Sequence, residues 1–415
     1  MKKPYEKQLG YDLLRGWCNV TSRSLFSKIT SSGAENIPSD GAVILAPNHC
    51  NTLMDALVVL QDRKEPVLFG ARADIFRKPF LNKFLRYIRI LPIPRVRDGL
   101  QEVLNNRQTM DEVVESLDHG MKYALFCEGT HRPKHSLLPL KKGLVRTALL
   151  ANERFAGSKP VYIVPVGLEY EDYYRLQTSL AIQYGEPINV TEYVTAHPEA
   201  TESEIYRGLL GILKERIASL ITYLPDDETY DGRWALTKMA GPEAAMAADE
   251  ELIEEAAAFD KERKDRRLSM WSFGQGHPVF WTVFKAVLCL LLLPAFLLCA
   301  VLSAPMWILS EHLVRGLKDK AFSRTARFGV KLGMTPLMVI IWALVFFLCF
   351  PFKRALLLFL LAIVSHRFFY SGVNEARILL SDIRLLFGHK DLKESYARLS
   401  GKAKSLTTKN QEPEI

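Results

Sequence analysis

His49 and Asp55 stand six residues apart in a segment that joins an apolar run to a helix-like one. A histidine can act as a general base on a hydroxyl, and a nearby carboxylate can fix its tautomer and stabilise the imidazolium that forms. Such a pair needs no serine or cysteine nucleophile. On an ideal helix, six residues turn two side chains about 240° apart, so one of the two must lie in a loop or an irregular first turn. Taken alone the pair is a weak signal, and its interpretation depends on the segments that follow.

Four apolar runs between Gly41 and Tyr193 predict buried strands, and each ends in polar residues or in a turn that contains glycine. The runs cover residues 42–46, 67–70, 123–127 and 161–168. Open α/β sheets bind ligands at the carboxyl ends of their strands. We therefore expect the residues after these runs to share one site.

Arginines follow the second run, at Arg72 and then at Arg95 and Arg97, the last two close to Pro92 and Pro94. An arginine fixed by flanking prolines at the end of a short strand suits bidentate binding of a phosphate. Arg95 is the preferred phosphate ligand, with Arg97 and Arg72 behind it.

The third run ends in Glu128, Gly129 and Thr130. Glycine lets the backbone approach a ligand closely, and a carboxylate can hydrogen-bond a substrate hydroxyl or orient neighbouring donors. The same residues would also suit an ordinary strand–turn–helix connection. In the fourth run, Pro165 indicates an edge strand or a strand end, and we expect it to shape the substrate pocket.

In this order, the four segments resemble the four sequence blocks of the glycerol-phosphate and lysophosphatidate acyltransferase superfamily, the PlsC-like acyltransferases. The similarity covers about residues 37–190. Two departures stand out: five residues rather than four separate His49 from Asp55, as in some eukaryotic-type glycerol-3-phosphate acyltransferases, and His131-Arg132 replaces a shorter Arg-Ser type ending. The resemblance implies a catalytic pair at His49 and Asp55 and substrate-binding residues at Arg95, Glu128, Gly129, Thr130 and Pro165.

The resemblance also implies an α/β fold with a mixed sheet flanked by helices, and a direct acyl transfer without cofactor or metal. The donor would be a thioester of coenzyme A or acyl carrier protein. The acceptor would be glycerol-3-phosphate or its 1-acyl form, and the sequence leaves that choice open. An inactive lipid-binding scaffold of the same family is the main alternative. A hydrolase is disfavoured because the sequence has no GxSxG nucleophile elbow.

The chain of 415 residues carries a formal net charge of +8, but its basic residues flank long apolar blocks and form no recognised nucleic-acid motif. Anionic lipid headgroups are therefore the expected partner. The six cysteines show no CxxC or Cys/His ligand spacing, so neither a metal site nor a disulfide framework is predicted.

Composition divides the chain into five predicted parts. Residues 1–36 form an amphipathic helix that either lies in a membrane interface or packs on its own domain, and no signal peptide precedes it. Residues 37–224 form the catalytic domain, on the cytoplasmic face of a membrane. Residues 225–276 form a charged, solvated helical linker, 277–371 the membrane-embedded helices, and 372–415 an amphipathic, partly disordered tail.

Two apolar blocks, residues 279–309 and 336–365, exceed the roughly 20 residues that cross a bilayer. Each is interrupted by proline, so each is one long tilted span or a hairpin that enters and leaves on one side. Basic residues flank both ends of both blocks, which favours hairpins.

Overall fold

The structure, a computed structural model, describes residues 3–93, 100–274 and 279–409, and within them the side chains of 100–107 and 408–409 are not described. Two compact units divide the chain. The first, here called the sheet unit, contains Met1–Ile221 and Ser310–Gly333. The second, the helical unit, contains Thr222–Leu309 and Met334–Ile415.

An eight-stranded mixed sheet forms the centre of the sheet unit, in the order β1-β7-β6-β2-β5-β3-β4, with β8 also paired to β6. The five strands from β6 to β4 run parallel, and β7 and β8 are antiparallel to β6. The four predicted runs are β2, β3, β5 and β6, and the predicted mixed sheet is confirmed. The strands are β1 Lys28–Ser32, β2 Ala42–Pro47, β3 Val67–Arg72, β4 Ile90–Ile93, β5 Lys122–Ala124, β6 Val161–Tyr170, β7 Ser179–Tyr184 and β8 Ile188–Asn189.

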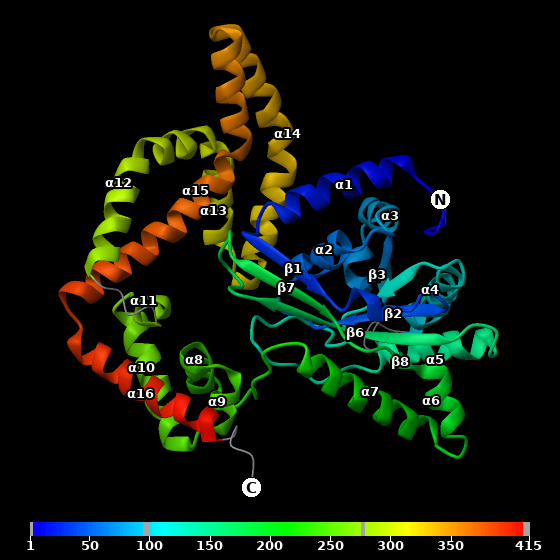
Figure 1. The fold of residues 1–415 in the computed structure, drawn as a ribbon. Coiled ribbons are helices and arrows are strands. Elements are labelled where there is room, and N and C mark those ends of the chain that lie inside the picture. Colours follow the sequence, from blue (N-terminus) through cyan, green and yellow to red (C-terminus); the bar gives the residue numbers. More distant parts are fainter. Residues whose placement is uncertain (1–2, 94–99, 275–278, 410–415) are drawn as a thin grey trace. The chain divides into compact units, whose positions relative to one another are not determined.

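Helices cover both faces of this sheet (Figure 1). Every residue of β2 is buried, which is why that strand reads as an unbroken apolar run rather than as an alternation. Figure 1 shows α1 and α2 on one face and α5, α6 and α7 on the other. The helices are α1 Leu9–Arg23, α2 Leu53–Asp62, α3 Pro79–Tyr87, α4 Leu100–Asp118, α5 Gly143–Phe155, α6 Val190–Ala196 and α7 Glu202–Ser219.

The first 36 residues are not a separate segment, contrary to the predicted boundary at residue 36. Strand β1 pairs in parallel with β7 and so belongs to the same sheet. Helix α1 contacts α2 and buries Tyr11, while Leu9 and Leu13 are 75% and 67% exposed. The helix thus packs on its own domain and leaves a second apolar edge uncovered.

Pro165 lies inside β6, not at an edge, so that prediction is wrong. On one side, Pro165 pairs with Ala46 of β2. On the other side its carbonyl accepts a hydrogen bond from the Gly185 N–H at 2.9 Å. Strand β6 pairs with β8 at 162–163 and with β7 at 166–170. Proline has no backbone N–H to donate. In β6 this removes no strand-pairing hydrogen bond, because Pro165 lies between the part of the strand that pairs with β8 and the part that pairs with β7.

The helical unit has a core of its own, so the predicted solvated connector is wrong. Its helices α8 Tyr230–Ala240, α9 Pro242–Ala247, α10 Glu250–Asp265 and α11 Met270–Gly274 pack with α16, Lys390–Lys409. Leu236, Ile253 and Phe259 are buried against Leu392 and Leu399. The tail thus forms the predicted amphipathic helix, and its apolar face is covered by the segment predicted to be a linker.

The apolar blocks form α12 Val279–Leu302, α13 Ala304–Gly316, α14 Ser323–Cys349 and α15 Phe352–Phe387. Among the described residues, three helices are long and apolar enough to cross a membrane, at Val279–Leu302, Lys320–Cys349 and Phe352–Phe387. Helix α12 is bent and contains Pro294 (Figure 1). Helix α15 is continuous, so the predicted boundary at residue 371 falls inside a helix.

Packing restricts how these helices can meet a bilayer. Ser310–Gly333 is part of the sheet unit, so the chain must return to the same side of the membrane between residues 221 and 310. Only α12 lies there as a candidate span among the described residues. Likewise, α16 shares a core with α8 to α10, which requires an even number of crossings in α14 and α15 together.

Helices α14 and α15 meet at a short turn and pack against each other. The two helices join at Phe350–Pro351, and Phe346 packs with Ala355 and Ala362. This contact favours the hairpin alternative for the second apolar block.

The hairpin topology predicts that Lys318 and Glu202 lie on the same side of the membrane. Both are exposed, so a single cysteine at either position, in a background without the six natural cysteines, is open to an impermeant maleimide. We expect the two variants to label identically in intact cells and again after permeabilisation. Labelling of one position and not the other in intact cells would contradict the topology.

Candidate active site

The loop between β2 and α2 brings His49 and Asp55 into contact. His49 lies in the loop and Asp55 in the first turn of α2. Thr52 between them has a φ of 51°, a left-handed conformation that is uncommon outside glycine. This irregular turn closes the six-residue separation that a regular helix could not, and His49 Nδ1 lies 2.8 Å from Asp55 Oδ2.

Asp55 is fully buried and surrounded by hydrogen-bond donors. Its Oδ2 accepts from the backbone N–H groups of Cys50 at 2.9 Å and Asn51 at 2.7 Å. Its Oδ1 accepts from the Tyr170 hydroxyl at 2.8 Å. Burial, and then the charge of Asp55, raise the pKa of the Tyr170 phenol well above its usual value, so the hydroxyl remains a donor.

This arrangement fixes the tautomer of His49. An ionised carboxylate can only accept hydrogen bonds, so Nδ1 of the imidazole carries the proton. Nε2 then presents its lone pair. The His49 side chain keeps 17% of its surface exposed while Asp55 keeps none, which is the arrangement of a general base and the carboxylate that orients it.

The loop after β5 holds the backbone of His49. Glu128 Oε1 accepts from the His49 N–H at 2.7 Å, and Oε2 accepts from the Leu138 N–H at 2.8 Å. The Arg132 N–H donates to the His49 carbonyl at 3.0 Å. Phe126 stacks on the imidazole with ring centroids 4.3 Å apart. The structure thus brings the first and third predicted segments together around one histidine.

Glu128 orients backbone donors in this conformation. Burial raises the pKa of its carboxyl, and the bonds from Leu138 and His49 oppose the shift. Gly129 has a φ of 71° and its N–H donates to the Phe126 carbonyl at 3.2 Å, so that donor serves the turn. Thr130 is exposed beside it.

Of the three arginines predicted to bind phosphate, the structure describes Arg72. Arg72 ends β3, and its guanidinium pairs with Asp74 at the surface. Arg95 and Arg97 lie outside the described residues. Pro165 lies one residue before Val166, whose carbonyl accepts from the Asn48 N–H at 3.2 Å. The phosphate-binding role of the arginines therefore stays a prediction.

Two residues that were not predicted as site residues contribute to the site. Tyr170 ends β6 and reaches Asp55 across 115 residues of chain. The Asn48 side chain bonds both the N–H and the carbonyl of Leu168, at 2.7 Å and 3.1 Å, and so ties the loop of His49 to β6. Both contacts join segments far apart in the sequence, so neither role follows from the local pattern.

The site thus places a partly exposed imidazole, paired with a buried carboxylate, at the carboxyl ends of parallel strands. Residues 28–169 match the model of the family described as Acyltransferase. An uncharacterised acyltransferase of Schizosaccharomyces pombe is 30% identical over 122 residues, 29% of this chain and 18% of that protein. Glycerol-3-phosphate O-acyltransferase 1 of Saccharomyces cerevisiae is 28% identical over 119 residues, 28% of this chain and 16% of that protein.

A third relative, 1-acyl-sn-glycerol-3-phosphate acyltransferase of Borreliella burgdorferi, is 24% identical over 34% of this chain and 54% of that protein. The chain spans at most about half the length of these curated relatives. The crystal structure of PlsC from Thermotoga maritima aligns with a TM-score of 0.36 at 21% identity, covering 51% of this chain and 79% of that chain. Residues 28–169 of this chain are thus the part that resembles the acyltransferase family.

Cys50 is the residue that could be mistaken for a nucleophile, since it adjoins His49. Its thiol is buried, and burial together with the charge of Asp55 raises its pKa well above the usual value. Burial also raises the pKa of Cys127 to about 12. Neutral buried thiols are inert. We expect Cys50→Ala to keep the rate within about threefold of the parent, since a buried neutral thiol takes no part in the transfer.

The matching measurement is intact-mass spectrometry of the parent after incubation with a thioester donor. A covalent acyl adduct at Cys50, or loss of activity in Cys50→Ala with a normal melting temperature, would contradict direct transfer.

Proposed function

We propose that this chain is a membrane-associated O-acyltransferase that moves a fatty acyl group from a thioester onto a hydroxyl of glycerol-3-phosphate or 1-acyl-glycerol-3-phosphate. The observation that carries the proposal is the 2.8 Å contact between His49 Nδ1 and the buried Asp55. It leaves Nε2 of the partly exposed imidazole able to accept a proton. The donor is acyl-CoA or acyl carrier protein, and the catalytic face is the cytoplasmic one.

The reaction follows from that geometry. His49 Nε2 removes the proton of the acceptor hydroxyl while Asp55 stabilises the imidazolium. The alkoxide attacks the thioester carbonyl, an ester bond forms and the carbon–sulfur bond breaks. The proton on Nε2 then passes to the departing thiolate. Apart from the two substrates, the step uses only groups that this chain supplies.

The assembled pair is what disfavours an inactive scaffold. A lipid-binding relative would have no reason to bury Asp55 among these hydrogen-bond donors and to leave His49 partly exposed beside it. The five-residue spacing between His49 and Asp55 tilts the acceptor toward glycerol-3-phosphate, by family resemblance. The names of the yeast and Borreliella relatives divide between the two acceptors.

The direct test incubates purified full-length protein in lipid nanodiscs with labelled acyl-CoA or acyl carrier protein and each acceptor. We expect His49→Ala to lower the rate by about 10²–10⁴, the usual cost of losing a general base. Folding should be unchanged, because the imidazole serves proton transfer rather than the core. Product identity is read by lipid mass spectrometry.

A rate for His49→Ala within a few-fold of the parent would remove His49 from the mechanism. The matched control is Lys320→Gln, at an exposed position, and it should leave the rate unchanged. A substitution of Asn51 would not serve as a control, because Asn51 contacts the site.

The next prediction concerns the binding of the acceptor phosphate by the arginines that follow the second predicted strand. Lysine keeps the charge of Arg95 but loses the planar fork that binds phosphate through two hydrogen bonds. We expect Arg95→Lys to raise the KM for the acceptor about tenfold, the effect of losing about 1.4 kcal/mol, with the donor KM within twofold. Steady-state kinetics with each substrate varied in turn measures both. Equal effects on the two substrates would indicate a structural arginine instead.

A further inference from the structure

The segment Ser310–Gly333, here called the return segment, joins the two apolar blocks and is built into the sheet unit. Six basic residues lie on it, from Arg315 to Lys331. The sequence pattern suggested that they serve lipid headgroups. One of them, Arg324, is instead completely buried.

Arg324 holds the loop that follows Tyr170. Its Nη2 donates to the carbonyl oxygens of Asp172, at 2.7 Å, and of Arg175, and to the Thr178 hydroxyl at 3.0 Å. Its guanidinium also lies over the Tyr170 ring, 5.6 Å from the centroid. Because the Tyr170 hydroxyl bonds Asp55, Arg324 fixes a residue that orients the catalytic carboxylate.

The guanidinium is held by aromatic faces as well as by oxygens. It lies 4.6 Å from the centroid of Phe26, and its Nε and Nη1 have no hydrogen-bond partner among the described residues. Burying a cation in this way is unfavourable unless its remaining surface meets π systems or dipoles. Such a site holds Arg324 in one place.

Thr325, the next residue, holds the catalytic loop itself. Its hydroxyl lies 2.7 Å from the Thr52 hydroxyl. Thr52 is the residue with φ of 51° that turns the chain between His49 and Asp55. Non-glycine residues in such conformations persist only where their surroundings hold them. The Thr325 contact is one of the interactions that hold this one.

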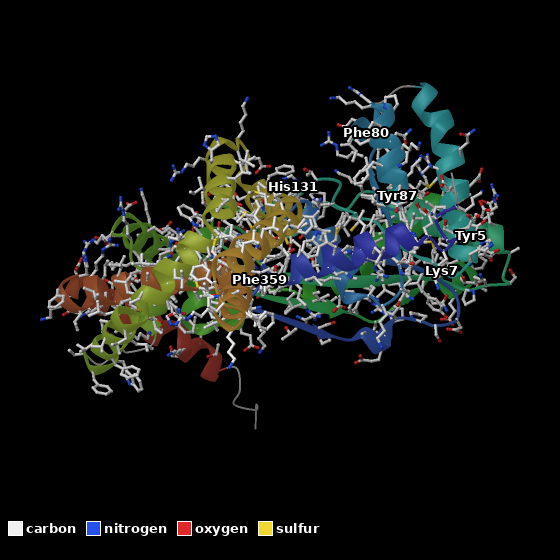
Figure 2. The ribbon with its side chains drawn as sticks, turned by 90° about the horizontal axis from the view of Figure 1, so that it is seen from above. Tyr5, Lys7, Phe80, Tyr87, His131 and Phe359 are labelled. Atoms are coloured by element: carbon white, nitrogen blue, oxygen red, sulfur yellow. The ribbon has the colours of Figure 1, made fainter. Side chains whose placement is uncertain are left out.

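A third contact from the return segment reaches His131, whose ring lies beside the imidazole of His49. Asp319 Oδ2 lies 2.9 Å from His131 Nε2, and the His131 ring meets the His49 ring edge-on with centroids 5.7 Å apart. His131 faces the return segment (Figure 2). The segment therefore contacts the loop of Thr52, the loop after Tyr170 and the loop of His131.

We propose that the return segment is a positioning element of the acyl-transfer site, in which Arg324 and Thr325 fix the two loops that align Asp55 with His49. The proposal rests on the proposed function for its kinetic consequence. Helix α14 begins with these residues and continues into the apolar hairpin, so one helix both enters the lipid and holds the catalytic pair. Neither residue touches the reacting atoms.

Thr325→Val is the sharpest test, because valine keeps the shape of threonine and removes only the hydroxyl. Misalignment of Asp55 weakens its support of the imidazolium that forms when His49 takes up the proton. We expect kcat to drop about 3- to 10-fold, the effect of one hydrogen bond, with both KM values within twofold. The pH profile of kcat/KM should differ from that of the parent.

Arg324→Lys and Arg324→Met extend the series. Lysine keeps the charge but cannot reproduce the planar contacts. The kcat of Arg324→Lys should therefore lie between those of the parent and of Arg324→Met. Lys320→Gln is the matched control, since the Lys320 ammonium donates to the carbonyls of Val314 and Arg315 on its own segment. It should keep the parent's kcat and pH profile.

A readout independent of turnover separates this proposal from the proposed function. The pH dependence of diethyl pyrocarbonate modification of His49, read by peptide mass spectrometry, reports the imidazole pKa without substrate. The titratable groups described around His49 include Asp55, Glu128, His131 and Cys50, and Thr325→Val changes none of them. A shifted His49 titration supports positioning even if the parent transfers no acyl group.

Two results would overturn the proposal. One is a Thr325→Val protein with an unchanged His49 titration and unchanged kcat. The other is a series in which Arg324→Lys and Arg324→Met lower only the melting temperature, with the pH profile and the kcat of the folded fraction equal to those of Lys320→Gln.

Discussion

A carboxylate removed completely from water determines much of this fold. An unpaired buried charge is strongly unfavourable, so Asp55 requires donors on every side, and the chain supplies them from distant segments. Two come from the backbone of its own loop, one from the imidazole of His49, one from Tyr170 at the end of β6 and a longer one from the Cys50 thiol. The parallel strands matter because they bring the ends of β2, β5 and β6 to one edge, where these donors meet.

The parts of the fold that follow from local pattern could be predicted. Continuous apolar runs bounded by turns gave β2, β3, β5 and β6, because strands buried on both faces need no alternation. The six-residue spacing of His49 and Asp55 required an irregular turn, and Thr52 provides it. The long apolar helices followed from composition alone. In each case the signal lies within about ten neighbouring residues.

What the sequence did not reveal depends on long-range pairing. Pro165 was placed at an edge because proline lacks a donor, but a gap between two partner strands satisfies the same requirement inside the sheet. The charged segment after residue 224 looked solvated because its core partners, Leu392 and Leu399, lie beyond the apolar blocks. Arg324 looked like a headgroup ligand because no local pattern distinguishes a buried arginine from an exposed one.

The predicted hairpin topology has a consequence for biogenesis. With both ends of each apolar block on one side, the basic return segment does not have to be translocated through the hydrocarbon. Membrane insertion then becomes a partitioning equilibrium, driven mainly by apolar area, that a folded or folding chain can reach from the aqueous phase. A chain of this kind can be released from the ribosome first and find its bilayer afterwards.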